Sequence, residues 1–332
     1  MTGRLATLTG DFLAQSPLRH GPFRVFYAGA IAAALGYTMQ TTVAAWLMAT
    51  LTPSAVMVAL VQTASTAPAL LFGLFAGAMA DIVDRRKVIV ATQVVLVAAS
   101  ALLGVAAIAG WVGPAMLLAM TFVVGAGFAF YQPAQQASVN DLVARAEMPQ
   151  AVSLNAVGFN VSRAIGPAIA GALPALVGTA SALFASAACF AAMIVAMRRV
   201  KTRVPILPGV PERLFSGVQI GLRYARHSPA LRAFILRTFS FTACASALWA
   251  LLPVIARDQL GLGASGYGFL FAMFGVGAVI GALSIPRQLK VRSLNRVVLS
   301  ATILWALANV LIAASGHVAF AAAGTFCSGA AW

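Results

Sequence analysis

The charged residues that could do chemistry in this sequence are concentrated in one short segment. The stretch GAMADIVDRRKVIV, residues 77–90, carries five of them: Asp81, Asp84, Arg85, Arg86 and Lys87. Residues 25–80 and 88–140 contain no charged side chain at all. Gly77 and Asp81 are one helical turn apart, as are Asp81 and Arg85. We therefore expect Gly77 to let another helix approach, and the Asp81 carboxylate to hold an arginine or to cap a neighbouring helix.

The stretch NAVGFNVSRAIGPAIAG, residues 155–171, is the second candidate site. On a helix, Asn155, Phe159, Ser162 and Gly166 share one face, with Arg163 at its edge. Gly166, Pro167 and Gly171 would permit close packing and a bend, which either a moving helix or a merely kinked one requires.

Arg163 lies about 18 Å into its apolar stretch by helical rise. A cation at that depth costs several kcal/mol unless it is paired or hydrated, so we expect it to face a cavity or a partner. Backbone carbonyls, the amides of Gln40, Gln62 or Gln132, and an anionic substrate are all candidate partners. A structural role, a substrate role and membership of a proton-coupling network stay open.

Other polar residues within apolar stretches could line a transport cavity or form hydrogen bonds between helices. They are Tyr37, Gln40, Gln62, Tyr131, Gln132 and Trp249. No Asp or Glu lies near the middle of any apolar stretch. Coupling to protons would therefore have to use Asp81, Asp84 or Asp141 near one membrane face.

Catalytic and cofactor chemistry find no support in the sequence. No nucleophile–base set, phosphate-binding glycine loop or metal-ligand spacing appears, and GVGAVIGA (275–282) reads as small-residue helix packing. Cys189, Cys244 and Cys327 lie in apolar runs, so we expect buried core residues rather than disulfides. The sequence indicates no enzyme, no metal, no cofactor and no ATPase subunit.

The composition requires a membrane. Of 332 residues, 61% are hydrophobic and 9% are charged, whereas a soluble domain carries about a quarter charged residues. Apolar stretches long enough to cross a bilayer as helices recur along the chain. We predict an all-α polytopic protein with spans at Phe23–Ala49, Ala55–Ala80, Val88–Gly110, Pro114–Ala137, Ala151–Val177, Ala180–Met197, Ala233–Ala256, Ser265–Ile285 and Val297–Ser315, and a tenth from Val318.

The cations set the expected orientation. The net charge is +15, but the cations sit between spans, as topology signals do, and do not indicate nucleic-acid binding. Nineteen of the 22 lysines and arginines fall on one side of the predicted spans, which places the N-terminus in the cytoplasm. No removable signal peptide is expected, because the first 24 residues have no long apolar core.

The expected organisation has four parts: an N-terminal cytoplasmic segment at 1–22, a six-helix bundle at 23–197, a basic linker at 198–232 and an incomplete second bundle at 233–332. Within the linker, Leu214, Phe215, Val218, Leu222 and Ala225 share one helical face opposite Arg213, Gln219, Arg223 and Arg226. This pattern predicts an amphipathic helix on the inner membrane surface, with a solvated linker helix as the alternative.

The motifs resemble one family. Gly77, Asp81, Arg85 and Arg86 match the loop signature G-x-x-x-D-R-x-G-R-R of the major facilitator superfamily, with Ile82 and Asp84 at two variant positions. Gly166, Pro167 and Gly171 resemble the G-P-x-x-G-G motif of its antiporters. Together with YQPAQQASVNDLV, LGLGASGYGFLFAMFGVGAVIGAL and the terminal GAAW, they are similar to the transmembrane secretion effector branch, which includes the enterobactin exporter.

The resemblance implies a secondary transporter of the bacterial inner membrane. It would export a small molecule, siderophore-like or drug-like, by alternating access, with the substrate between two six-helix halves. The loop aspartate would latch the halves by meeting the start of span eleven. Because the family has twelve spans and this sequence stops within the tenth, the alternative is a transport-incompetent remnant that acts at most as a membrane-embedded interaction protein.

Overall fold

The protein is an all-helical bundle in the computed structural model, which describes residues 16–200 and 226–332. Its helices are α2 (Gly21–Leu51), α3 (Ala55–Ile82), α4 (Arg85–Ile108), α5 (Pro114–Asn140), α6 (Met148–Val177), α7 (Thr179–Arg199), α9 (Pro229–Val254), α10 (Ala264–Val291), α11 (Leu294–Ala314) and α12 (Val318–Ala331). Short 3₁₀ helices, Pro17–Arg19 and Arg145–Glu147, precede α2 and α6, and a π-helical turn, Ile255–Gln259, extends α9.

The helix ends follow local sequence signals. The side chain of Ser54 accepts a hydrogen bond from the Met57 amide at the start of α3, and that of Asp84 accepts one from the Arg86 amide at the start of α4. Pro114 occupies the first turn of α5, where its missing N–H costs nothing. Between α6 and α7 the single residue Gly178 turns the chain with φ of 96°, a conformation that suits glycine.

Seven of the described helices are long and apolar enough to cross a membrane. The long helices α2 and α6 are not among these seven. Both nevertheless pack with α7 and with one another inside the bundle. Their position in the fold, more than their hydropathy, places them among the spanning helices. Large apolar side chains such as Leu70, Ile108 and Val310 are exposed on the outside of the bundle, as contact with lipid requires.

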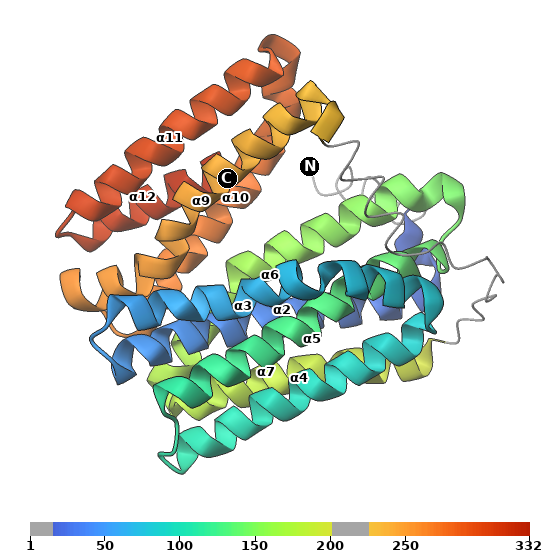
Figure 1. The fold of residues 1–332 in the computed structure, drawn as a ribbon, viewed down its shortest axis with the longest axis horizontal. Helices are drawn as coiled ribbons and strands as arrows, with labels where there is room; N and C mark the ends of the chain where they lie inside the picture. The colour runs from blue at the N-terminus through green and yellow to red at the C-terminus, as the bar shows by residue number, and fades with distance from the viewer. Residues whose placement is uncertain (1–15, 201–225) are drawn as a thin grey trace, which may run out of the picture.

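The helices form two groups (Figure 1). In the first, α3 packs on α5, α4 on α5 and α7, and α2 on α6 and α7, around two clusters of buried residues. In the second, α12 packs on α10 and α11. A third cluster of buried residues contains side chains from α9, α10, α11 and α12. The predicted amphipathic linker helix falls on residues 213–226, which except for Arg226 lie outside the described residues.

The two groups meet mainly where α10 lies against α6 and α9 against α3. Near the turn after α2, the Arg257 guanidinium donates to the Thr52 carbonyl oxygen at 3.2 Å, and the Trp46 and Tyr267 rings stack with centroids 5.9 Å apart. In Figure 1 the ribbons converge at this end and diverge toward the end where α3 passes into α4.

Small residues let α6 and α10 approach closely. A side chain added at Gly171 would lie 2.6 Å from the Ala264 carbonyl oxygen, and one added at Gly268 would lie 2.5 Å from that of Pro167. Gly275, in the GVGAVIGA stretch, packs in the same way against the backbone of Ala164. The small-residue packing predicted for this stretch is confirmed.

Candidate functional site

A cavity of about 800 Å³ lies in the first group, between α2, α3, α5 and α6. This volume falls within the range of small-molecule sites. Its lining comprises Tyr27, Ala30, Ile31, Ala34, Gly77, Ala80, Asp81, Phe128, Tyr131, Gln132, Pro133, Gln135, Gln136, Ala137, Val139, Asn140, Val152, Asn155, Ala156, Gly158 and Phe159. The exposed residues Asp81, Gln136 and Asn140 mark its mouth, at the ends of α3 and α5.

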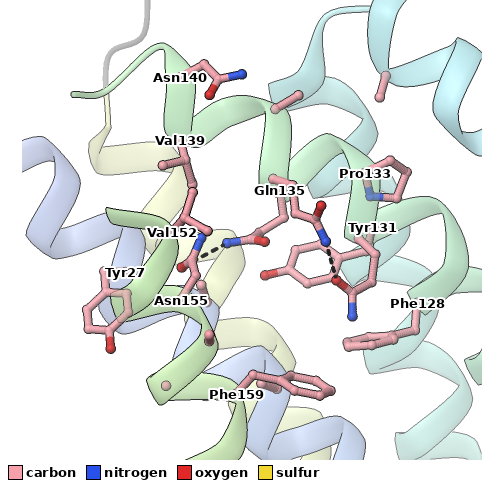
Figure 2. Close-up of a pocket in the computed structure, with 18 of the residues that line it drawn as sticks. Tyr27, Phe128, Tyr131, Pro133, Gln135, Val139, Asn140, Val152, Asn155 and Phe159 are labelled. Atoms are coloured by element: carbon pink, nitrogen blue, oxygen red, sulfur yellow. Dashed lines mark hydrogen bonds between the residues drawn. The ribbon is translucent and has the colours of Figure 1, made fainter. Parts of the chain in front are cut away.

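Amide side chains provide most of the polar lining. The Gln135 Nε2 donates to Asn155 Oδ1 at 3.4 Å, which joins α5 to α6 across the cavity, and Gln136 Nε2 donates to Gln132 Oε1 at 3.3 Å (Figure 2). Both hydrogen bonds are long, so these groups can exchange partners at little cost. The lining therefore offers both donors and acceptors to a ligand.

The Tyr131 hydroxyl differs from the amides of the cavity wall because it is buried and has no hydrogen-bond partner among the described residues. Tyr131 is 3% exposed, and its oxygen has no hydrogen-bond partner among the described residues. A buried hydroxyl without a partner costs about 1–3 kcal/mol. Figure 2 places Tyr131 beside Gln135 and Asn155 within the same wall. Tyr131 thus adds to the cavity wall a buried hydroxyl that has no hydrogen-bond partner among the described residues.

Aromatic rings form the inner end of the cavity. Phe128 stacks on Tyr37 with centroids 3.8 Å apart, and the Tyr37 hydroxyl is held by the Ser65 carbonyl oxygen at 3.2 Å. Opposite, Tyr27 donates to the Leu154 carbonyl oxygen at 2.8 Å. These contacts fix the rings, so the cavity combines rigid aromatic surface with adaptable amides, a combination suited to amphipathic molecules.

The charged loop differs from its expected arrangement. The Arg85 guanidinium contacts the Asp141 carboxylate at 2.7 Å, together with the carbonyl oxygens of Ala80 and Ala137 at 3.2 Å each. Asp84 caps α4. Asp81 neither holds an arginine nor caps a helix in the described part of the chain; Asp141, at the C-terminal end of α5, provides the carboxylate for Arg85.

Asp81 is therefore available to the cavity. No hydrogen bond or ion pair joins it to another residue in the described part of the chain, and it is the single charged residue in the lining. Gly77 also lines the cavity, and a side chain added there would meet nothing within 4 Å. The close approach of another helix expected at Gly77 is absent from this structure because the bundle is open at this end.

Arg163 lies at the junction of the two groups, on α6. Its guanidinium carbon is 5.2 Å from the Trp249 ring centroid on α9 and 6.0 Å from that of Phe159. The amides of Gln40, Gln62 and Gln132 were among the candidate partners of Arg163. In the structure none of them forms a hydrogen bond with its guanidinium. Gln40 is instead 1% exposed, with neither amide atom paired among the described residues. Aromatic faces replace the expected amide partners.

The two motif glycines of α6, Gly166 and Gly171, pack against different helices. A side chain at Gly166 would collide with Thr38 of α2, and Gly171 faces α10. Pro167 is buried between them. The motif therefore joins α6 both to its own group and to the second group.

The structure brings together only part of the predicted site. Tyr131, Gln132 and Asn155 line the cavity with Gly77 and Asp81, whereas Tyr37, Gln40, Gln62 and Trp249 lie outside its lining. Gln135, Gln136 and Asn140 were missed, although three amides in six residues of an otherwise apolar span are a readable signal. Cys244 is exposed, not buried as expected, because its side of α9 faces away from the cluster around Trp305.

The sequence is similar to a family of membrane proteins and to individual transporters. A profile of the family described as "Transmembrane secretion effector" matches residues 13–332. The chain is 24% identical over 305 residues to the "Multidrug efflux pump Tap" of Mycolicibacterium fortuitum, covering 89% of this chain and 74% of that protein. It is 25% identical over 246 residues to the "Staphyloferrin A transporter" of Staphylococcus aureus, covering 74% of this chain and 62% of that one.

Structural comparison agrees on the fold. The nucleoside transporter NupG superposes with a TM-score of 0.73 at 12% identity, covering 93% of this chain and 79% of that structure. A bacterial homologue of the lysosomal transporter Spinster, in an inward-facing occupied conformation, superposes with a TM-score of 0.65 at 16% identity, covering 93% and 72% of the respective chains.

Proposed function

Because this chain belongs to the transmembrane secretion effector family, a multi-pass membrane branch of the major facilitator superfamily of transporters, we propose that it is a secondary transporter that exports small amphipathic molecules by alternating access. The cavity between α2, α3, α5 and α6 is its substrate site. The observation that carries this proposal is the unpaired, buried Tyr131 hydroxyl in a cavity walled by amides and aromatic rings.

The cavity opens on the side from which an exported substrate would enter. The mouth lies at the end of the bundle that bears Arg85, Lys87 and Arg145, and cation-rich loops are retained in the cytoplasm. We infer an inward-facing state in the bacterial inner membrane with a cytoplasmic N-terminus. A substrate from the cytoplasm or the inner leaflet would then enter past Asp81 and reach Phe128 and Phe159.

Asp81 is the best-placed group for coupling to protons. Of the three aspartates near this membrane face, Asp84 caps a helix and Asp141 is paired with Arg85. Asp81 alone of the three lines the cavity, where it can exchange a proton with water and compete for a substrate's charge. This assignment predicts that Asp81→Asn changes the dependence of export on the pH gradient more than it changes substrate binding.

Transport by the 332-residue chain in proteoliposomes tests the proposal. We expect gradient-dependent movement of at least one amphipathic fluorescent dye, chosen from a cationic, a neutral and a carboxylate-bearing member. Tyr131→Phe should lower the rate about tenfold, since a lost hydrogen bond of about 1.4 kcal/mol has that effect. Equal dye movement in liposomes with and without the protein would contradict it and favour a membrane-embedded interaction protein.

A further inference from the structure

The neighbours of the Arg163 side chain are aromatic rings. It lies in the middle of α6 at the junction of the two helix groups, and its neighbours are the rings of Phe159 and Trp249. Among the described residues, no carboxylate, carbonyl or amide oxygen bonds its guanidinium. A guanidinium carries five N–H donors, and at mid-membrane depth these donors require a partner.

The aromatic contacts restrict where that partner can bind. Trp249 and Phe159 lie over the guanidinium, so they satisfy its charge through their π faces but none of its N–H groups. The N–H groups lie in the guanidinium plane and point outward from its edge. Ring faces are electronegative and disfavour an anion, so an anion would have to bind at the edge of the guanidinium. A planar oxyanion fits this edge with two parallel hydrogen bonds.

The cavity ends beside this position, at Phe159, while Arg163 itself is not part of the lining. Phe159 belongs both to the cavity lining and to the contacts of Arg163, one helical turn away on α6. Asp81, the single charged group in the lining, stands at the mouth. An anionic group would be repelled at the mouth and attracted at the inner end, and the apolar remainder of such a ligand would lie over Phe128 and Phe159.

We propose that Arg163, beside Phe159 and Trp249, is an oxyanion site that adjoins the inner end of the cavity at Phe159, and that its ligand is an aromatic carboxylate. This inference rests on the proposed function, because it names the substrate class of the same cavity. A phospholipid phosphate carries the same chemistry, so the test must distinguish the two sources.

Equilibrium binding of tritiated 2-naphthoate to the full chain in phosphatidylcholine nanodiscs tests the site. The uncharged 2-naphthamide has the same ring system and serves as the reference ligand. We expect naphthoate to bind at least tenfold more tightly than naphthamide. Arg163→Gln should remove this preference, a loss of about 10–100-fold in naphthoate affinity, while the affinity for naphthamide stays within twofold.

Arg237→Gln is the matched control. Arg237 is exposed on α9 and its substitution removes the same charge from the protein, so it should leave the preference intact. Arg163→Lys, which keeps the charge but loses the two-pronged geometry, should retain an intermediate preference. Size-exclusion profiles and helical content establish that each variant is folded. If Arg163→Gln does not fold, the ligand preference of Arg163→Lys is compared with that of the wild type instead.

Equal affinities for the two ligands, or no effect of either Arg163 substitution on naphthoate binding, would overturn the oxyanion site. If the oxyanion site is overturned but Tyr131→Phe lowers the affinity for naphthamide, the proposed function still holds. Loss of naphthoate binding on adding phosphatidylglycerol, in the wild type and not in Arg163→Gln, would support the oxyanion site with a lipid as its source.

Discussion

Arg85 is paired with Asp141, at 2.7 Å, and not with Asp81, which lies four residues before it in the sequence. The pair joins the start of α4 to the end of α5, and both side chains are only about one-fifth exposed, at 22% and 20%. Because Asp141 occupies the guanidinium, Asp81 keeps an unpaired carboxylate at the cavity mouth. The two aspartates therefore differ: Asp141 is part of an ion pair, and Asp81 lines the cavity.

The stability of the protein should depend on Asp141 and not on Asp81. Asp141→Asn leaves the partly buried Arg85 without its charge partner, and we expect a loss of about 1–2 kcal/mol in unfolding free energy. Asp81→Asn removes no contact and should change it by less than about 0.5 kcal/mol. Denaturant unfolding in detergent, followed by circular dichroism, measures both. Equal effects of the two substitutions would contradict the pairing.

Two tyrosines should respond in opposite ways to loss of the hydroxyl. Tyr131→Phe removes a buried group that lacks a partner, so stability should be unchanged or rise by up to about 1 kcal/mol while dye export falls. Tyr37→Phe removes the hydrogen bond to the Ser65 carbonyl oxygen and should lower stability by about 1 kcal/mol. Unfolding midpoints and transport rates of the two variants are the measurements. A Tyr131→Phe protein that is less stable and fully active would contradict this account.

The glycines at positions 166 and 77 should tolerate alanine very differently. A methyl group at Gly166 would collide with the Thr38 side chain, so Gly166→Ala should cost about 1–3 kcal/mol. Gly77→Ala adds a methyl to open space and should raise stability by up to about 1 kcal/mol through helix propensity. Thermal unfolding of the two variants decides, and a neutral Gly166→Ala would refute the close packing of α6 on α2.

The orientation predicts which positions react from outside the cell. Trp111, in the turn between α4 and α5, is 75% exposed and lies at the end of the bundle opposite Lys87. In a variant lacking the three native cysteines, Trp111→Cys should be labelled in intact cells by an impermeant maleimide. Lys87→Cys should be labelled only after the cells are permeabilised. Labelling of Lys87→Cys in intact cells, with Trp111→Cys labelled only after permeabilisation, would contradict the proposed topology and the inward-facing assignment.

Much of the fold follows from patterns that are local in the sequence. Runs of apolar residues of spanning length, bounded by Ser54, Asp84, Pro114 and Gly178, fix where helices begin and end, because each backbone N–H in a membrane must be bonded within its own helix. The predicted start of the tenth span at Val318 agrees with α12. The polar residues Asn155, Tyr131 and Gln132 were recognisable as site candidates because polar groups in apolar spans require a cavity or a partner.

Which of those polar residues meet was decided by the tertiary structure. Spacing placed Asp81 one helical turn from Arg85, but the packing of α4 on α5 pairs Arg85 with Asp141. Likewise, Tyr37 and Gln40 have the same polar character as Tyr131, yet the rotation of α2 directs them away from the cavity lining. Arg163 received aromatic neighbours because α9 places Trp249 against α6. Helix formation is governed by contacts a few residues apart, whereas these pairings join segments distant in sequence, and only the packing of whole helices sets them.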